Sequence, residues 1–231
     1  GWNTPSMWGT AWLTPGLKAS SPDPADGAED VTVPLVRWSA GRTAAFHDVY
    51  FGTNPTPGAA ELRGRQPFAM YWHGPGLTPG TTYYWRIDEV EADGVTIHTG
   101  DVWSFTSIPL TAHNPNPTNG ARYVTPDADL SWSAGYTGVT HDVYFGTAQA
   151  DVAAGTGGTF KGNQPATKYD PGTLARGNTY YWRIDEVEAD RTTKHTGQVW
   201  SFKTIPDMPI TDPTFVGWWK LDEGSGAAAL D

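Results

Sequence analysis

The residues best suited to chemistry in this chain are carboxylates, and they occur twice in the same order. The stretch TYYWRIDEVEAD fills residues 82–93 and again residues 179–190 without a change. A glycosidase needs two acids on opposite sides of a cleft, about 5–10 Å apart, whereas these acids are neighbours in one extended segment. No nucleophile motif or phosphate-binding glycine loop accompanies them. We therefore expect no catalytic residue and no enzymatic activity.

Histidine is the second candidate for chemistry. His47 and His98 are expected at one end of the same folded unit. A nearby carboxylate, Glu91 or Asp93, could complete a zinc or nickel site with them. The equivalent histidines of the second copy are His141 and His195. Ordinary hydrogen bonding of histidines at a strand edge explains the same pattern, and the acids lack the D-x-D-x-D-G spacing of a calcium loop. We therefore expect no metal and no cofactor.

The repeat extends well beyond these acids. The block beginning at Trp38 recurs at Trp132, and HDVYFGT at residues 47–53 recurs at 141–147, both with an offset of 94 residues. The later TYYW and VWSF blocks recur with an offset of 97 residues, so the second copy has three extra residues within 148–169. Because this segment is rich in Gly, Ala and Lys, we expect it to be a loop, where an insertion costs little.

The repeat divides the chain into four parts. They are residues 1–18, the tail of a preceding domain or a linker strand; 19–109, the first repeat; 112–206, the second repeat; and 207–231, a linker and the opening strand of an incomplete domain. Short Pro-rich joints at Ile108–Pro117 and Ile205–Pro213 are expected to keep the domains semi-extended.

Apolar and polar side chains alternate with a period of two inside each repeat. In YYWRID, the side chains of Tyr83, Trp85 and Ile87 fall on one face, and in HDVYFG those of Val49 and Phe51 do the same. Pro-Gly and Asp-Gly turn signals separate these runs, and no stretch has a convincing helical period. Short strands at regular spacing over about 90 residues predict an all-β fold with two tandem β-sandwiches.

The run LTPGTTY at residues 77–83 resembles the segment that enters the sixth strand of fibronectin type III domains. Trp38 in an early strand and a closing VWSF strand extend the resemblance. It implies two immunoglobulin/fibronectin type III-like sandwiches in which Tyr83 and Tyr180 form tyrosine corners, with the hydroxyl bonded to the backbone. The second repeat lacks the proline of this run, but we expect its turn to persist because Gly177 remains. The repeated sequence motifs also resemble modules of large secreted proteins of planctomycete-type bacteria.

The alternate residues of these strands are expected to point away from the core. Tyr50, Tyr84 and Arg86 would lie together on the outer face of one sheet, and cross-strand pairing on a solvated sheet is one explanation for them. A contact face for a glycan or a protein is the other, since aromatic residues and Arg are enriched at interfaces. The copies of these candidate binding residues are Tyr144, Tyr181 and Arg183.

Both ends of the chain contain apolar residues that match neither repeat. The segment FVGWWKLDEGSGAAALD at 215–231 resembles the opening strand of laminin-G-like and concanavalin-type jelly rolls. A fragment of a larger protein explains such ends. Alternatively, the terminal strand of one copy completes a sheet in the next copy and builds a filament. The candidate assembly residues are Trp8, Trp12, Val216, Trp218, Trp219 and Leu221.

The composition limits the partners and the location. The net charge of −10 disfavours nucleic acid, because phosphate binding needs clustered Lys and Arg. No run of about 18 apolar residues is present that would insert into a membrane. A Cys-free, acidic chain with 12 Trp, 27 Gly and 19 Pro suits an exported bacterial protein. We therefore expect a secreted or cell-surface location.

These observations predict a non-catalytic extracellular module that acts in structure or adhesion, as a spacer or as an assembly unit. Its partners would be other copies of itself or neighbouring domains of the same protein. The alternative is a carbohydrate-binding accessory region of a polysaccharide-processing protein, with cell-surface or extracellular polysaccharide as the ligand. The outward tyrosines distinguish the two, because only the second function needs them exposed.

Overall fold

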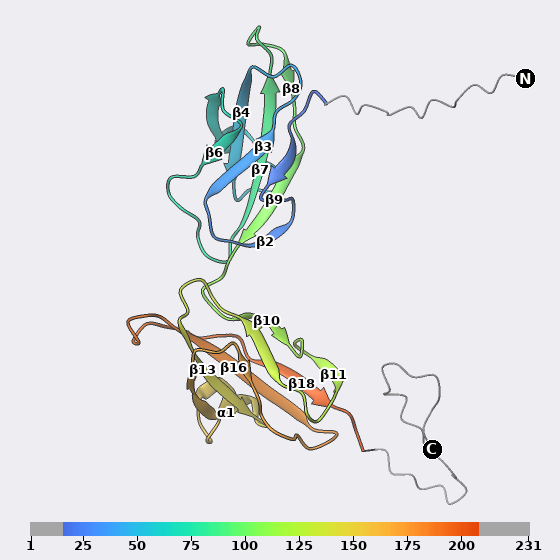
Figure 1. Ribbon diagram of the computed structural model, residues 1–231, viewed down its shortest axis with the longest axis vertical. Helices are drawn as coiled ribbons and strands as arrows, with labels where there is room; N and C mark the ends of the chain where they lie inside the picture. Colours follow the sequence, from blue (N-terminus) through green and yellow to red (C-terminus); the bar gives the residue numbers. More distant parts are fainter. Residues whose placement is uncertain (1–15, 208–231) are drawn as a thin grey trace, which may run out of the picture.

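The alternating segments form strands, and each repeat folds into its own all-β sandwich in a computed structural model that describes residues 16–207 (Figure 1). The expectation of two tandem β-sandwiches is therefore confirmed. The predicted assembly residues at the two ends lie outside the described residues; they are Trp8, Trp12, Val216, Trp218, Trp219 and Leu221.

The first sandwich consists of a three-stranded and a six-stranded sheet. The smaller sheet has the order β1 (Ser20–Asp23), β3 (Leu35–Ser39), β6 (Met70–Trp72). The larger has the order β2 (Ala28–Val31), β9 (Val102–Ser107), β7 (Thr82–Val90), β4 (Phe46–Gly52), β5 (Leu62–Gln66), and β8 (Ile97–His98) pairs with β7. A short 3-10 helix, η1 (Ala59–Glu61), lies in the connection between β4 and β5.

The second sandwich repeats this strand order. Its smaller sheet is β10 (His113–Asn116), β12 (Leu130–Ser133), β15 (Lys168–Tyr169). Its larger sheet is β11 (Ala121–Val124), β18 (Trp200–Thr204), β16 (Thr179–Val187), β13 (Thr140–Gly146), β14 (Phe160–Gln164), and β17 (Lys194–His195) pairs with β16.

The period-two alternation explains the core of each sandwich. Trp85 and Ile87 in β7 are fully buried, and so are their copies Trp182 and Ile184 in β16. They pack between the two sheets with the other aromatic residues of the repeat. Burying a large apolar side chain stabilises the fold by about 1.5–3 kcal/mol, which compensates for the absence of disulfides.

The tyrosine corners implied by the sequence are present in both sandwiches. The backbone N–H of Thr78 donates to the hydroxyl of Tyr83 at 2.8 Å, and that of Ala175 donates to the hydroxyl of Tyr180 at 2.9 Å. The turn of the second sandwich persists without its proline, because Gly177 adopts a left-handed φ of 71°.

The three extra residues of the second repeat do not form the expected loop. The connection between β13 and β14 (residues 147–159) is four residues longer than that between β4 and β5 (residues 53–61), and the segment from Tyr169 to β16 is one residue shorter than its counterpart from Tyr71 to β7. The longer connection forms a helix, α1 (Gln149–Ala154), which packs against β16 and β13. The fully buried side chain of Val152 anchors the helix, and Gly155 ends it in the left-handed conformation. The helix has less than two turns, too few for a helical period to be visible in the sequence.

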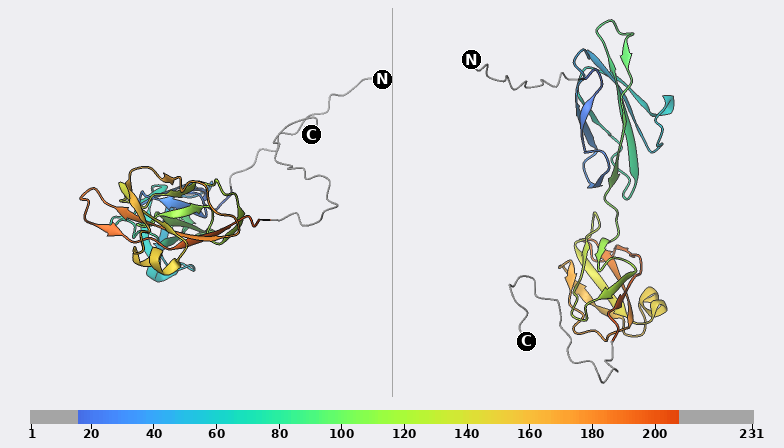
Figure 2. Two further views of the ribbon diagram at one scale, coloured as in Figure 1. Left: turned by 90° about the horizontal axis from the view of Figure 1, so that it is seen from below. Right: turned by 90° about the vertical axis from the view of Figure 1, so that its right-hand side faces the viewer.

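The two sandwiches lie end to end, joined by a short linker (Figure 2). The linker is shorter than the expected Ile108–Pro117, because residues 113–116 of that range belong to strand β10. The backbone N–H of Ile108 donates to Val31 of the first sandwich at 3.2 Å. The carbonyl of Pro109 accepts from the N–H of Tyr136 of the second sandwich at 2.8 Å. Successive linker residues are therefore bonded to opposite domains.

Candidate functional site

The structure brings the predicted tyrosine and arginine residues together on the outer face of each larger sheet. The guanidinium of Arg86 in β7 lies 4.2 Å from the centre of the Tyr50 ring in β4. Tyr84 precedes Arg86 in β7 and lies opposite Gly52. In the second sandwich Arg183 lies 4.2 Å from the centre of the Tyr144 ring. A cation over an aromatic ring at this distance is an attractive contact.

These arginines are less accessible than the sequence analysis expects. Arg183 is only 6 % exposed, because the connection that contains α1 folds over it and the carbonyl of Ala153 accepts a hydrogen bond from its Nη1. Nη1 of Arg86 donates in the same way to the carbonyl of Pro57 at 3.0 Å. The expectation of a solvent-facing Arg183 is therefore wrong. Tyr181, like Tyr84, is half-buried.

The acids beside these arginines also have partners within the fold. Arg86 donates to both carboxylate oxygens of Asp88, at 2.8 and 3.1 Å, and the N–H of Gly100 donates to the same group at 3.0 Å. In the second sandwich burial raises the pKa of Asp185, against the opposing effects of the Gly197 N–H and Arg183. The carboxylates thus hold the chain between β7 and β9, and between β16 and β18.

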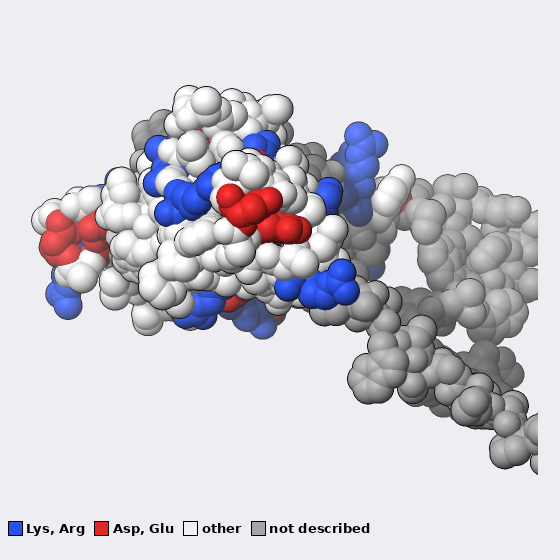
Figure 3. Space-filling view, turned by 90° about the horizontal axis from the view of Figure 1, so that it is seen from above, with Lys and Arg blue, Asp and Glu red and all other residues white. Residues whose placement is uncertain are grey.

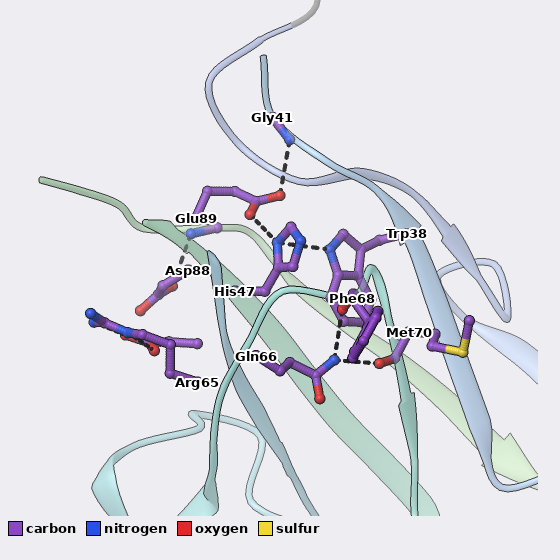
Figure 4. A network of polar contacts seen from close by, with 11 residues as sticks. Trp38, Gly41, His47, Arg65, Gln66, Phe68, Met70, Asp88 and Glu89 are labelled. Atoms are coloured by element: carbon purple, nitrogen blue, oxygen red, sulfur yellow. Dashed lines mark hydrogen bonds and ion pairs between the residues drawn. The ribbon is translucent and has the colours of Figure 1, made fainter. Parts of the chain in front are cut away.

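Each of the predicted metal-binding histidines instead contacts one carboxylate. His47 Nδ1 contacts the fully buried carboxylate of Glu89, whose other oxygen accepts from the N–H of Gly41 at 2.9 Å (Figure 4). The ring of Trp38 packs edge-on against the imidazole, with 5.3 Å between the ring centres. His141 and Glu186 repeat the buried pair, with 2.8 Å between Nδ1 and Oε2.

A second histidine–carboxylate pair lies nearer the surface. His98 Nε2 lies 2.8 Å from Oε1 of Glu91, and the hydroxyl of Thr43 donates to that oxygen at 2.9 Å. The hydrogen bond with His98, followed by that of Thr43, lowers the pKa of Glu91. His195 and Glu188 repeat the pair at 2.7 Å. Within residues 16–207, no three His, Cys, Asp or Glu side chains converge on a position suited to a metal ion.

The last acid of each repeated stretch forms a turn. Asp93 Oδ1 accepts from the N–H groups of Val95 and Thr96 at 3.0 and 2.9 Å, and Asp190 makes the same bonds in the second copy. Side chains of this kind stabilise tight turns by bonding to the backbone two or three residues ahead. The repeated carboxylates therefore have structural roles, which explains why the whole stretch recurs.

One exposed surface is not among the features expected from the sequence. On the smaller sheet of the first sandwich, outward apolar side chains of β3, β6 and the residues just before β6 form an apolar strip, and the outward Arg37 of β3 lies opposite Met70. The apolar strip consists of Leu35, Phe68, Met70 and Trp72. Its signal in the sequence is a difference between the repeats, because the corresponding residues of the second copy are polar or small.

No helix within the described part of the chain is long and apolar enough to cross a membrane. Acidic and basic side chains are interspersed over the end of the molecule seen from above (Figure 3).

Comparison with known proteins supplies structural neighbours only. No protein-family model and no curated protein matches the chain. Among solved structures, it is similar to the chicken CNTN1 FN1–FN3 domains, with 11 % identity and a TM-score of 0.30 over 83 % of this chain and 68 % of that one. It is also similar to the Clostridium thermocellum CbhA fibronectin(III)-like modules, with 12 % identity and a TM-score of 0.28 over 80 % and 94 %. The fibronectin type III-like character of the two sandwiches rests on their strand order and their tyrosine corners.

Proposed function

We propose that this chain is a non-catalytic structural module that holds neighbouring parts of an extracellular protein at a fixed spacing. The observation that carries the proposal is the linker between the sandwiches. Ile108 is bonded to Val31 through its N–H, and its carbonyl accepts from Gly80 at 3.1 Å, while the next carbonyl binds Tyr136 of the other domain. A flexible tether would leave these groups to water.

The same linker contacts recur where the chain enters the first sandwich and where it leaves the second. The carbonyl of Gly16 accepts from the N–H of Arg42 at 3.0 Å, as Pro109 does from Tyr136. The N–H of Ile205 donates to Val124 at 2.9 Å, as that of Ile108 does to Val31. Each sandwich is thus hydrogen-bonded to the backbone just before it and just after it, as a spacer requires.

Close approach of the backbones tightens the junction further. A Cβ atom on Gly135 would lie 2.0 Å from the carbonyl oxygen of Leu110, and one on Gly41 would lie 2.1 Å from that of Leu17. Only glycine permits this packing of the entering chain against each sandwich.

The finer parts of the proposal rest on the sequence. The resemblance of the repeats to modules of secreted bacterial proteins supports a secreted or cell-surface location. Assembly of copies through the terminal segments stays a prediction, because those residues lie outside the described part of the chain. A carbohydrate-binding role gains no support from the outer face of the second sandwich, where Arg183 is covered by the connection that contains α1.

Small-angle X-ray scattering tests the spacer function. We expect a narrow distribution of intramolecular distances with two maxima, one within and one between sandwiches. A matched variant with Gly-Ser-Gly-Ser inserted after Pro109 should lose the second maximum, since flexible linkers adopt a wide range of end-to-end distances. Identical profiles for the two proteins, both without a second maximum, would contradict the proposal.

A further inference from the structure

The apolar strip is a local difference between two otherwise similar sandwiches. Inward positions are kept in both repeats: Tyr71 corresponds to Tyr169, and the register of β6 on β3 matches that of β15 on β12. The outward positions differ. Phe68, Met70 and Trp72 correspond to Ala166, Lys168 and Asp170, and Leu35 corresponds to Asp129.

The second sandwich shows that the fold does not need apolar residues on this face. There Lys168 Nζ lies 2.6 Å from a carboxylate oxygen of Asp129, so a surface ion pair occupies the corresponding part of the sheet. Such polar pairs are ordinary on a solvated sheet face. The apolar residues of the first sandwich therefore require an explanation other than folding.

Three residues of the strip are largely exposed, while Leu35 is half-buried and the exposed Arg37 lies opposite Met70. Phe68 is 67 % exposed, Met70 50 % and Trp72 58 %. Trp72 lies directly opposite Leu35 in the register of β6 and β3, so the side chains adjoin across the strands. Contiguous exposed apolar side chains on a monomeric domain mark an interaction surface.

The partner must contact the face of the sheet rather than extend it. Within residues 16–207, strand β6 pairs only with β3, and no described strand occupies its other edge. However, the side-chain amide of Gln66 donates to the carbonyls of Phe68 and Met70 and so occupies acceptors along this edge (Figure 4). An added strand would have to displace that amide.

We propose that the N-terminal segment, residues 1–15, packs on the apolar strip of the same molecule. The segment contains Trp2, Met7, Trp8, Trp12 and Leu13 and no charged residue. It joins the first sandwich, which carries the strip. The segment that precedes the second sandwich is the short linker, and that sandwich has no strip.

Chain length allows this contact. The segment leaves the first sandwich beside Gly16, and nearby Ser20 pairs with Ser39 at one end of β3. Leu35 lies four residues farther along that strand, about 13 Å at 3.3 Å per residue. Fifteen residues reach up to about 50 Å. Because a short tether gives an effective concentration in the millimolar range, the attached segment outcompetes a second copy at micromolar concentration.

The other terminal segment fits the strip less well. Residues 208–231 are attached to the second sandwich, beyond Asp207, and include Asp212, Lys220, Asp222 and Glu223. Charged groups lose hydration when they are placed on an apolar surface. The N-terminal segment is therefore the better occupant in both position and chemistry.

Paramagnetic relaxation enhancement tests the proposal in the full chain. The chain has no Cys, so Thr4→Cys provides a single site for a nitroxide. We expect the signals of the Met70 methyl and the Trp72 indole to lose intensity when the nitroxide is oxidised, while those of Lys168 do not. Trp8→Ser/Trp12→Ser should abolish the loss, and so should Met70→Lys/Trp72→Asp, which installs the residues of the second sandwich.

A mixed sample identifies the occupant. Isotope-labelled protein without nitroxide is combined with unlabelled protein that carries it. Because the observed molecules carry no nitroxide, intensity loss at Met70 in this mixture would show that a second copy covers the strip, and would overturn the proposal. Absence of any loss at Met70 in the nitroxide-bearing protein would overturn it as well. Since Trp8 and Trp12 precede the strands of the first sandwich in the sequence, their variant remains informative even if the Met70 and Trp72 variant unfolds.

Discussion

His113 of the second sandwich contacts Asp30 of the first, with 2.8 Å between Nε2 and Oδ1. The two atoms are close but are not aligned as a hydrogen bond. His113 corresponds to Ser20 of the first sandwich, and Asp30 corresponds to Tyr123 of the second. The pair therefore belongs to the junction and not to the repeated fold. It adds a specific side-chain contact to the backbone bonds of the linker.

Removal of this pair should loosen the junction without unfolding either sandwich. For His113→Ala we expect the two sandwiches to tumble less as one body, while the free energy of unfolding changes by about 1 kcal/mol, the upper end for pairs near the surface, because the His113 side chain is only 18 % exposed. Nitrogen-15 relaxation of the two domains measures the first effect and urea unfolding the second. Ser20→Ala, at the corresponding position of the first sandwich, is the control. Unchanged relaxation in His113→Ala would show that the pair does not restrain the junction.

The tyrosine corners should contribute measurably to stability. Tyr83→Phe removes the acceptor of the Thr78 N–H and should lower the free energy of unfolding of the first sandwich by about 1–2 kcal/mol. Tyr180→Phe should do the same to the second. Tyr123, which is 72 % exposed, provides the control Tyr123→Phe, for which we expect no change. Equal free energies of unfolding for all three variants in urea would show that the tyrosine corners do not stabilise the sandwiches.

Backbone conformation predicts a stabilising substitution. Arg191 has a φ of 61° at the position where the first sandwich has Gly94, with a φ of 74°. A left-handed conformation costs a residue with a Cβ about 1 kcal/mol or more. Arg191→Gly should therefore raise the free energy of unfolding by up to about 1 kcal/mol, and Gly94→Ala should lower it by a similar amount. Arg191→Ala keeps the Cβ atom and should change the free energy of unfolding little. If Arg191→Ala stabilises the chain as much as Arg191→Gly does, the cause is loss of the arginine side chain and not the backbone conformation.

The carboxylates paired with histidines near the surface predict that the stability of the fold depends on pH. Hydrogen bonds with His98 and Thr43 lower the pKa of Glu91 from its ordinary 4.5, and those with His195 and Thr137 lower that of Glu188. A carboxylate with a lowered pKa stabilises the fold at pH values above 4.5, and this stabilisation is lost as the pH falls below that value.

Glu91→Gln/Glu188→Gln should therefore lose less of its unfolding free energy between neutral pH and strong acid than the parent chain does. Urea unfolding at a series of pH values measures this slope. Glu29→Gln, on the exposed strand β2, is the control and should follow the parent chain. If the double variant also follows the parent, the two pairs contribute nothing to acid stability.

Much of the fold is predictable from the sequence because its determinants are local. Alternation in TYYWRID places Trp85 in the core, and a turn glycine followed by Tyr83 specifies the corner. The outcome for Arg183 was not predictable in this way. Its burial depends on a connection more than 20 residues earlier in the chain, whose helix is too short to show a period.

The apolar strip was not predictable from one repeat alone. The resemblance between the repeats is strongest at the inward positions, whereas the strip lies at outward positions where the repeats differ. The difference between Met70 and Lys168 becomes informative only when the register shows that both side chains point outward. The identity of the inward residues makes the second sandwich an internal control for the first.

The most direct test of the spacer account is the distance between the two sandwiches in solution. Nitroxides on Thr99→Cys and Lys161→Cys, at exposed positions in different sandwiches, report it by double electron–electron resonance. The account predicts one narrow distance distribution, which broadens in the variant with Gly-Ser-Gly-Ser after Pro109. A broad distribution in the parent chain, no narrower than that of the insertion variant, would contradict it.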